Sequence, residues 1–533
     1  MLSGWYVKLY PEQKPAADFL ISCLTFEGGA ALLSEQGTGK TIITLAVLEK
    51  LGLRNILIVT PKTSVHVTWA NRIPNACTVI GEYVSGVLII GYEAFRTRIK
   101  KLLKKKWDIV VFDESQGLKS RNSSQSKAAR RLRNVVPMRL ILSGTPIDES
   151  PIDMWAQMRF IKPEVFGDVW AAPRKPKPGQ RGPYFETEFC RPCGFMGKQR
   201  EFIPERMPEF LRRLKPYVYR LQNTMEAVEF VEVPTLLLGS QRRIYDQMER
   251  HGIVKIEGEK FKAGMRAVRD VRCFQIVGGF LSNDETTVKV GNAKQRKLRT
   301  LIKRLDRPVI FCRYLSEVNE VKSILEEEFK RVAIITGKVK DTPKEKRRTR
   351  IIEDFQSRKY DALVCQERTG GVSIELTASN ELVLYSMGFS RINFEQIIAR
   401  FRRHGQTKRV RVFLIIAKDT VDEEPLAAIR RKGETVNPIM DFLNQNPKEI
   451  TMSDEKKKAA PKKAAAKKTA PKKAAKAATE EFAFGVDYVA EKLGVSVFTA
   501  RGKLRAAEIK KAGKSYGWKT KGEADKAINS LTA

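Results

Sequence analysis

The chain has 533 residues, of which 42% are hydrophobic, and carries a formal net charge of +37. This length is too great for one ordinary domain and the apolar content is high enough for packed cores, so a single small domain and a wholly disordered chain are both excluded. The excess of Lys and Arg favours a polyanionic partner, nucleic acid first, and the alternative is a solvated basic surface without a specific partner.

Cysteine content and apolar runs indicate the compartment. Seven cysteines are few and odd in number, which argues for a reducing environment and against a disulfide framework. Residues 1–20 lack the basic-then-apolar pattern of a signal peptide, and the longest apolar strings are far shorter than a membrane span. The sequence therefore predicts an intracellular protein without a membrane segment.

Short apolar runs separated by helical patterns occur in two blocks of the chain. In the first block the predicted strands cover residues 30–33, 55–60, 87–90, 108–112 and 139–142. In the second block they cover residues 308–311, 332–335, 361–364, 382–385 and 410–416. Continuous apolar strands separated by helices are typical of doubly wound parallel sheets, so the fold class is α/β with two lobes.

These patterns divide the chain into five segments. We expect the first lobe at residues 1–165 and the second at 293–450, with a helical or inserted region at 166–292 between them. Residues 451–480 are mainly Lys, Ala and Pro, with Ala-Pro-Lys-Lys-Ala-Ala repeated at an interval of ten residues. Such a segment has no apolar surface to bury and is predicted to be a disordered linker, followed by a small α-helical unit at 481–533.

A glycine-rich loop follows the first predicted strand and precedes a helix. It is formed by Gly37, Thr38, Gly39, Lys40 and Thr41. In this context backbone N–H groups converge on the phosphates of a nucleotide, Lys40 reaches the β and γ oxygens, and Thr41 ligates Mg²⁺. Ser34 replaces the first glycine of the strict pattern, so a plain glycine-rich turn is the alternative.

An acidic pair ends the strand at residues 108–112. This strand would deliver Asp113 to the carboxyl edge of the sheet, where it can hold the Mg²⁺ shell, and Glu114 is placed to polarise the attacking water. An acidic pair after a strand can also cap a helix, but the phosphate loop in the same sheet favours the catalytic interpretation.

Two arginines of the second lobe complete this pattern. Arg400 and Arg403 lie three residues apart, ahead of Gly405-Gln406, and could stabilise negative charge on the γ-phosphate. Arginines on a solvent-facing helix surface are the alternative. With Lys40 and Asp113 upstream, we expect one nucleotide site divided between two lobes that open and close during hydrolysis.

Further motifs occur in a fixed order around these residues. They are Tyr10-Pro11-Glu12-Gln13, Thr60-Pro61-Lys62 with Trp69, Gly91-Tyr92-Glu93, Leu142-Ser143-Gly144-Thr145-Pro146, Thr369-Gly370-Gly371, and the segment from Gln396 to Gln406. The ordered set resembles a Swi/Snf-type DNA translocase of helicase superfamily two, in particular its compact bacterial or phage-like members. The resemblance covers about residues 5–432 and implies two tandem RecA-like lobes.

The resemblance also implies residue roles. Gln13 would read adenine and Gly371 would contribute to the nucleotide site. Ser143, Thr145 and Gln396 would couple hydrolysis to lobe movement. Lys62 and Thr369 would contact DNA, and the cofactors would be ATP and Mg²⁺. Gln116 stands where many members have His, and Asp148 where Asn is common, so details of the coupling are the part in doubt.

Three weaker signals lie outside these motifs. Cys190 and Cys193 are half of a zinc site, and because a structural zinc needs about four ligands we expect no metal there. The segment from Phe95 to Lys106 predicts an amphipathic basic helix, either solvated or in contact with phosphates. Residues 489–505 resemble a helix-turn-helix, in which Arg501, Lys503 and Arg505 would face nucleic acid, although a plain structural hairpin is the alternative.

The sequence thus predicts an ATP-dependent enzyme that moves along duplex DNA or remodels DNA or protein–DNA complexes. A strand-separating or branch-processing repair helicase is the alternative within the class. A non-enzymatic, basic DNA-compacting protein is the alternative outside it. We expect double-stranded or branched DNA as the partner, a free monomer, and a bacterial or phage protein acting in the cytoplasm, with the nucleus less favoured.

Overall fold

The computed structural model describes residues 8–444, except residues 74, 173–183, 257, 284–285, 338, 340–346 and 368–374, and in the C-terminal part only residues 484–485, 517–518, 525–526 and 529. The chain divides into two compact units, residues 1–458 and 459–533. The predicted linker at 451–480 lies outside the described residues, as do Arg501, Lys503 and Arg505. In the second unit β19 (Phe484–Gly485) pairs antiparallel with β20 (Gly517–Trp518), a strand pair that the sequence did not predict.

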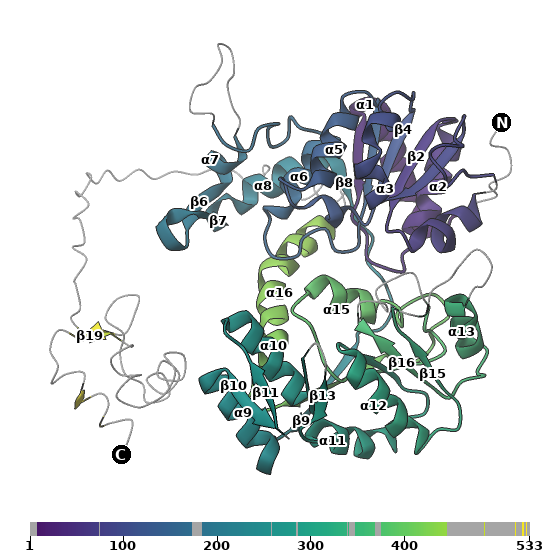
Figure 1. Cartoon of the computed structure of the whole chain (residues 1–533). Coiled ribbons are helices and arrows are strands. Elements are labelled where there is room, and N and C mark those ends of the chain that lie inside the picture. Colours follow the sequence, from purple (N-terminus) through teal and green to yellow (C-terminus); the bar gives the residue numbers. More distant parts are fainter. Residues whose placement is uncertain are drawn as a thin grey trace, which may run out of the picture. The chain divides into compact units, whose positions relative to one another are not determined.

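The first lobe is built on a six-stranded parallel sheet with the strand order β3-β2-β4-β5-β1-β8 (Figure 1). Its strands are β1 (Gly29–Leu32), β2 (Ile56–Thr60), β3 (Val87–Gly91), β4 (Ile109–Asp113), β5 (Met138–Leu142) and β8 (Val218–Tyr219). Along β2, Leu57 and Val59 pack on one side of the sheet and Ile56 and Ile58 on the other, so both faces are buried. The predicted doubly wound sheet is confirmed.

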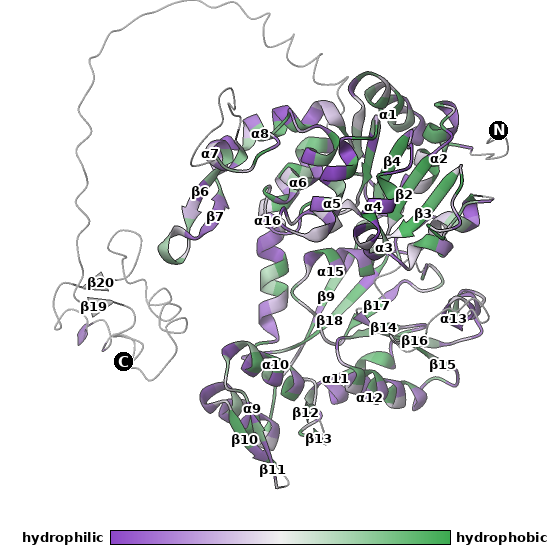
Figure 2. Ribbon diagram, turned by 45° about the horizontal axis from the view of Figure 1, so that its top comes forward, coloured by the Kyte–Doolittle hydropathy of each residue, from purple (hydrophilic) through white to green (hydrophobic). Residues whose placement is uncertain are grey.

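Helices cover both faces of this sheet. They are α1 (Lys14–Glu27), α2 (Lys40–Lys50), α3 (Tyr92–Thr97), α4 (Ile99–Leu102), α5 (Ser124–Arg133) and α6 (Asp153–Ile161). Leu20 of α1 and Leu48 of α2 belong to one hydrophobic core, whereas Phe95 of α3, Leu132 of α5 and Phe160 of α6 belong to the other. The hydropathy colouring of Figure 2 shows the strands β2 and β3 as the most apolar part of the lobe.

The second lobe repeats this architecture with the strand order β15-β16-β14-β17-β18-β9. Its strands are β9 (Glu229–Thr235), β14 (Val309–Cys312), β15 (Val332–Ile335), β16 (Ala362–Gln366), β17 (Glu381–Leu384) and β18 (Arg411–Ala417). Its helices include α11 (Ala293–Ile302), α12 (Leu315–Glu326), α13 (Arg347–Gln356) and α15 (Arg391–Ile398). All pairs in the sheet are parallel, as predicted.

The region expected between the lobes contributes to both of them. Its strand β8 pairs with β1 of the first sheet, and its strand β9 pairs along its whole length with β18 of the second. Before β8 lie α7 (Phe185–Phe189), the antiparallel strands β6 (Cys190–Cys193) and β7 (Gln199–Phe202), and α8 (Met207–Leu214). After β9 lie α9 (Gly239–His251), β10 (Ile253–Ile256), β11 (Glu259–Lys262), α10 (Arg266–Val277), β12 (Phe280–Ser282) and β13 (Thr287–Lys289).

The long helix α16 (Glu423–Asn444) connects the second lobe back to the first (Figure 1). Leu426, in its first turns, belongs to a core of the second lobe. Val436, Ile439, Met440 and Leu443, further along, belong to a core of the first. The chain therefore passes between the lobes through both the β8–β9 connection and α16. None of the helices among the described residues combines the length and hydropathy needed to cross a bilayer.

Candidate nucleotide site

The glycine-rich loop joins β1 to α2, which begins at Lys40. Gly37 and Gly39 have φ angles of 85° and 86°, in the left-handed region that glycine adopts without strain. A side chain at Gly37 would meet the Arg402 carbonyl oxygen at 2.8 Å, and one at Gly39 would meet Gln13 Nε2 at 2.3 Å. The turn therefore favours glycine at both positions, and at Gly37 a backbone neighbour adds a second reason.

Lys40 is the first residue of α2, and its side chain reaches back to the start of the loop. Its Nζ donates to the carbonyl oxygens of Ser34 (2.9 Å) and Glu35 (3.0 Å). Burial lowers the pKa of Lys40, while the carboxylates of Glu114 and Asp113 act in the opposite direction. The first turn of α2 also carries Thr41, half-buried beside Lys40.

Ser34, the departure from the strict glycine pattern, has a structural explanation. Its side chain is fully buried, and its Oγ accepts a hydrogen bond from the Leu221 backbone N–H (2.9 Å). A glycine here would leave that buried N–H without this acceptor, at a cost of about 1–3 kcal/mol. Ser34 therefore ties the loop to the chain that follows β8.

Asp113 ends β4 and is held by two side-chain donors. Its Oδ2 accepts hydrogen bonds from Thr60 Oγ1 (2.9 Å) and Trp69 Nε1 (2.9 Å). Trp69 has 0% exposure. The resemblance groups it with Thr60-Pro61-Lys62, the motif from which Lys62 is expected to contact DNA. The indole faces Asp113 inside the lobe, and the DNA-contacting role of the motif around it stays a prediction. Lys62, from the same motif, is exposed.

Glu114 has an unusual backbone conformation and a raised side-chain pKa. Its φ of 52° and ψ of 56° lie in the left-handed region, a strained conformation that recurs at functional sites. Burial, and then the charge of Asp113, raise the pKa of Glu114. Lys40, the hydrogen bond from Gln116 and Arg400 of the other lobe act in the opposite direction.

A chain of hydrogen bonds connects Glu114 to the predicted coupling motif. Gln116 Nε2 donates to Glu114 Oε2 (2.6 Å), and Gln116 Oε1 accepts from Ser143 Oγ (2.7 Å). Ser143 Oγ in turn accepts from the Thr145 backbone N–H (3.1 Å). The glutamine that replaces histidine thus lies between the coupling motif and the predicted catalytic carboxylate, and it does so with an uncharged amide.

Arg400 and Arg403, which we call the finger arginines because they are predicted to act on the γ-phosphate from the second lobe, lie just beyond α15 in the finger segment, residues 396–406. Arg400 is 3% exposed, and burial, followed by the charge of Arg403, lowers its pKa. Arg403 pairs through Nη1 with Glu375 Oε1 (3.0 Å), and its charge also lowers the pKa of Lys40. Both arginines therefore lie within electrostatic reach of the first lobe. Gln396 is half-buried on α15, one turn before Arg400.

Contacts between the lobes surround the loop. Asn223 Nδ2 donates to the carbonyl oxygens of Gln36 (3.3 Å) and Arg402 (3.2 Å). The Tyr10 hydroxyl lies 3.2 Å from His404 Nε2, with the two rings edge to face. The predicted phosphate loop and the predicted arginine segment thus meet in the structure, although no sequence motif pointed to Asn223.

Gln13 has both ends of its amide engaged within the first lobe. Its Nε2 donates to the Thr38 carbonyl (3.0 Å), and its Oε1 accepts from the Tyr10 N–H (3.0 Å). In this state Gln13 supports the phosphate loop, and its reading of adenine stays a prediction. Thr369 and Gly371 lie outside the described residues.

The cysteine pair occupies the two ends of β6. Cys190 is buried and Cys193 is half-buried, and both are free thiols. Burial, followed by the charge of Glu186, raises the pKa of the Cys190 thiol to about 12. Within the described part of the chain, no group of three or more His, Cys, Asp or Glu is arranged to hold a metal ion.

Comparison with known proteins gives the family. Residues 80–268 match the SNF2-related domain and residues 293–405 match the helicase conserved C-terminal domain. An uncharacterized ATP-dependent helicase of Mycoplasma pneumoniae is 24% identical over 438 residues, covering 77% of this chain and 40% of that protein. The putative ATP-dependent helicase/translocase YwqA of Bacillus subtilis is 24% identical over 466 residues, covering 80% and 48%.

A eukaryotic relative and a solved structure are also similar. The mouse SWI/SNF-related matrix-associated actin-dependent regulator of chromatin subfamily A member 1 is 25% identical over 475 residues, covering 79% of this chain and 43% of that protein. The SWI2/SNF2 ATPase core of Sulfolobus solfataricus in complex with dsDNA has 20% identity and a TM-score of 0.37, covering 85% of this chain and 98% of that one. The chain spans less than half the length of these curated relatives. It belongs to the family of proteins in which an SNF2-related domain is followed by the helicase conserved C-terminal domain.

Proposed function

We propose that this protein is an ATP-driven translocase that moves along duplex DNA. The observation that carries the proposal is the meeting of the phosphate loop and the arginine segment, one from each lobe, through Asn223, Gln36 and Arg402. A nucleotide held by the loop would lie within reach of charge from both lobes. Its hydrolysis would therefore change the contact between the lobes, which is what a motor requires.

In ATP hydrolysis each of four predicted catalytic side chains would have one role. Lys40 would neutralise the β and γ oxygens, and Glu114 would orient the attacking water. Arg400 and Arg403 would stabilise the charge that develops on the transferred phosphoryl group. In this state Arg403 pairs with the exposed Glu375, so we expect that ion pair to break when Arg403 turns to the phosphate.

The residues around Asp113 fit a magnesium ion. Mg²⁺ prefers hard oxygen donors, and the Thr41 hydroxyl with an Asp113 carboxylate oxygen supplies this donor set beside the loop. Asp113 Oδ1 accepts the Glu114 N–H at 3.0 Å, while Thr60 and Trp69 hold the other oxygen, so the carboxylate has a fixed orientation. When bound, Mg²⁺ would neutralise phosphate charge.

The charge distribution of the first lobe supports DNA as the track. No acidic residue lies between Glu93 and Asp108 or between Glu114 and Asp148. These two stretches carry α3 with α4 and α5, and α3 contacts α5. Their exposed cations are Arg96, Arg98, Lys100, Lys101, Lys104, Lys106, Arg121, Lys127, Arg130 and Arg131, which we call the α3–α5 basic face.

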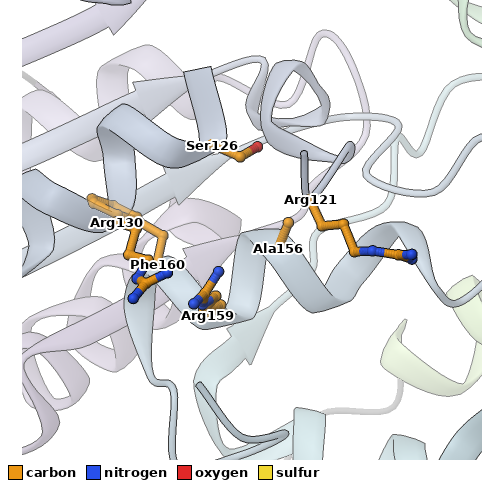
Figure 3. A pocket seen from close by; sticks show the side chains of 6 residues that line it. All are labelled: Arg121, Ser126, Arg130, Ala156, Arg159 and Phe160. Atoms are coloured by element: carbon orange, nitrogen blue, oxygen red, sulfur yellow. The ribbon is translucent and has the colours of Figure 1, made fainter. Parts of the chain in front are cut away.

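The cations of this face are available to an external anion. Within the described residues, only Arg96 of this set lies at ion-pair distance from a carboxylate, that of Glu93 at 3.9 Å. Figure 3 shows a small pocket beside α5 that is lined by Arg121, Arg130 and Arg159 of α6, the last of which is paired with Asp168 (2.8 Å). The α3–α5 basic face would therefore attract the negatively charged phosphate backbone of DNA. We also assign the exposed Lys62, and from sequence Thr369, Arg501, Lys503 and Arg505, to DNA contacts.

The decisive experiment measures ATP hydrolysis by the native chain and by Lys40→Ala, each with and without duplex DNA. We expect DNA to stimulate the native chain and Lys40→Ala to be inactive, and equal rates in both proteins would refute the proposal. Displacement of the third strand of a triplex, compared with unwinding of a fork, then separates translocation from strand separation. Gel filtration of the free protein checks the proposed monomer.

A further inference from the structure

The segment that joins the lobes runs along the phosphate loop. Residues 220–228 connect β8 to β9, and the chain at β8 continues its pairing into the loop. The Leu33 N–H donates to the Tyr219 carbonyl, and the Glu35 N–H donates to the Leu221 carbonyl, each at 2.9 Å. The first half of this crossing segment is therefore fixed to the loop of the first lobe.

The second half of the crossing segment is fixed to the second lobe. Arg402 Nη2 donates to the Met225 carbonyl (2.9 Å), and Arg409 Nε donates to the Ala227 carbonyl (3.2 Å). Arg402 lies between Arg400 and Arg403 in the predicted finger segment. The crossing segment consequently touches both halves of the nucleotide site within a few residues.

Asn223 lies where the crossing segment passes from its first half, fixed to the first lobe, to its second half, fixed to the second lobe. Its Nδ2 donates to Gln36 O of the loop (3.3 Å) and to Arg402 O of the finger segment (3.2 Å). Its Oδ1 accepts the Met225 N–H (3.0 Å), and its own N–H donates to Glu35 Oε2 (3.0 Å). Two carbonyl oxygens cannot bond to each other, so a group with two N–H donors is what can hold them together.

We propose that Asn223 is a positioning residue for ATP hydrolysis, which sets the distance between the phosphate loop and the finger arginines. Arg400 and Arg403 flank the carbonyl that Asn223 holds, so a shift of that carbonyl displaces both guanidinium groups. A displacement of about 1 Å in a group that stabilises a transition state can cost as much as a hundredfold in rate.

Arg220 anchors the start of the crossing segment, which allows a small side chain such as Asn223 to act as a spacer. Arg220 Nη1 donates to the Leu33 carbonyl (2.7 Å), and Nη2 pairs with Glu35 (3.2 Å). Its Nε donates to Asn444 Oδ1 at the end of α16 (2.8 Å). Because Arg220 is buried and held at three points, the backbone before Asn223 has a defined position.

The test uses Asn223→Asp in the full-length chain. This substitution keeps the size and the Oδ1 acceptor but removes both N–H donors. Asn223→Ala is the second variant, and Gln222→Ala, at the exposed neighbouring position, is the matched control. The measurements are kcat and KM for ATP, and the Kd of ADP and of ADP with aluminium fluoride, which mimics the transferred phosphoryl group.

We expect kcat to fall about tenfold or more in both Asn223 variants, while KM and the Kd of ADP change less than about twofold. The Kd of ADP with aluminium fluoride should rise by the same factor as kcat falls.

The inference rests on the hydrolysis part of the proposed function. If the native chain failed to hydrolyse ATP, that function would fail, while the ratio of the two dissociation constants would still decide the role of Asn223. Three results would overturn the role proposed for Asn223. They are an unchanged kcat in the Asn223 variants, an equal weakening of the binding of ADP and of ADP with aluminium fluoride, and an effect of the same size in Gln222→Ala.

Discussion

The burial of Trp69 against Asp113 leads to a prediction that separates two interpretations of one motif. If Trp69 contacts DNA, then Trp69→Phe should weaken DNA binding and leave the fold unchanged. In the structure the indole is fully buried, and its N–H is one of two side-chain donors to Asp113 Oδ2. Trp69→Phe should therefore lower the free energy of unfolding and leave DNA affinity within about twofold.

The magnitude follows from what is removed. A hydrogen bond to a charged, buried acceptor contributes about 1.5–3 kcal/mol, and the smaller ring leaves space that costs about 1 kcal/mol more. We expect Trp69→Phe to destabilise the first lobe by about 2–4 kcal/mol. Thr60→Val, which removes the other donor at constant shape, should cost about 1–3 kcal/mol. Together the two substitutions leave Asp113 Oδ2 without either donor, so their joint cost should exceed the sum.

Urea unfolding followed by circular dichroism measures the stability, and fluorescence anisotropy of labelled duplex DNA measures the affinity. ATP hydrolysis should also fall, since Asp113 loses part of its fixed orientation. A tenfold weaker DNA affinity in Trp69→Phe with unchanged unfolding would refute the reasoning. So would a double variant no less stable than either single one, because the donors would then contribute nothing to the placement of Asp113.

Three further predictions concern the same lobe. Burial and the charge of Asp113 raise the pKa of Glu114, so the acid limb of the plot of kcat against pH should lie above the range of an ordinary glutamate. The hydrogen bond from Gln116 lowers this pKa, so Gln116→Leu should move the acid limb to higher pH. Ser34→Gly, which restores the strict loop pattern, should lower the free energy of unfolding by about 1–3 kcal/mol in urea titrations and should not raise kcat. Ile439→Ala, in the part of α16 packed into the first lobe, should lower the melting temperature and cost about 2–5 kcal/mol, whereas an exposed site such as Glu434 should tolerate alanine.

The sequence predicted the sheets well because their signal is local. The central parallel strands, such as β2 and β4, are buried on both faces, so they appear as uninterrupted apolar runs, and the loop and acidic pair follow such runs directly. Lys40, Asp113 and Glu114 could thus be assigned to one sheet edge from local patterns alone. Strand β8 escaped prediction because it has only the two residues Val218 and Tyr219, too few to form a pattern.

The features that sequence could not predict depend on contacts between distant residues. Asn223 and Arg220 act through backbone carbonyls, which carry no sequence signature, and nothing in their neighbours marks them as part of a nucleotide site. The contact between Trp69 and Asp113 was not predicted for a related reason, since a motif gives the order of residues but not the direction of a side chain. The apolar positions of α16 are spaced as in a helix, but this spacing does not show that the helix packs on the first lobe.

The path of the chain explains how a nucleotide could control the lobes without a separate transmitting element. Arg220 bonds both to Leu33, where the loop begins, and to Asn444, where α16 ends, so both connections between the lobes converge on the loop. A movement that separates the phosphate loop from the arginine segment would therefore change the hydrogen bonds of Asn223, which bonds to both. At about 1 kcal/mol for each bond, exchanging two or three of them amounts to about 2–3 kcal/mol, which lies within the usual range of about 1–3 kcal/mol for a coupling between sites. Under the proposed function, the crossing segment would therefore couple phosphate occupancy to lobe position.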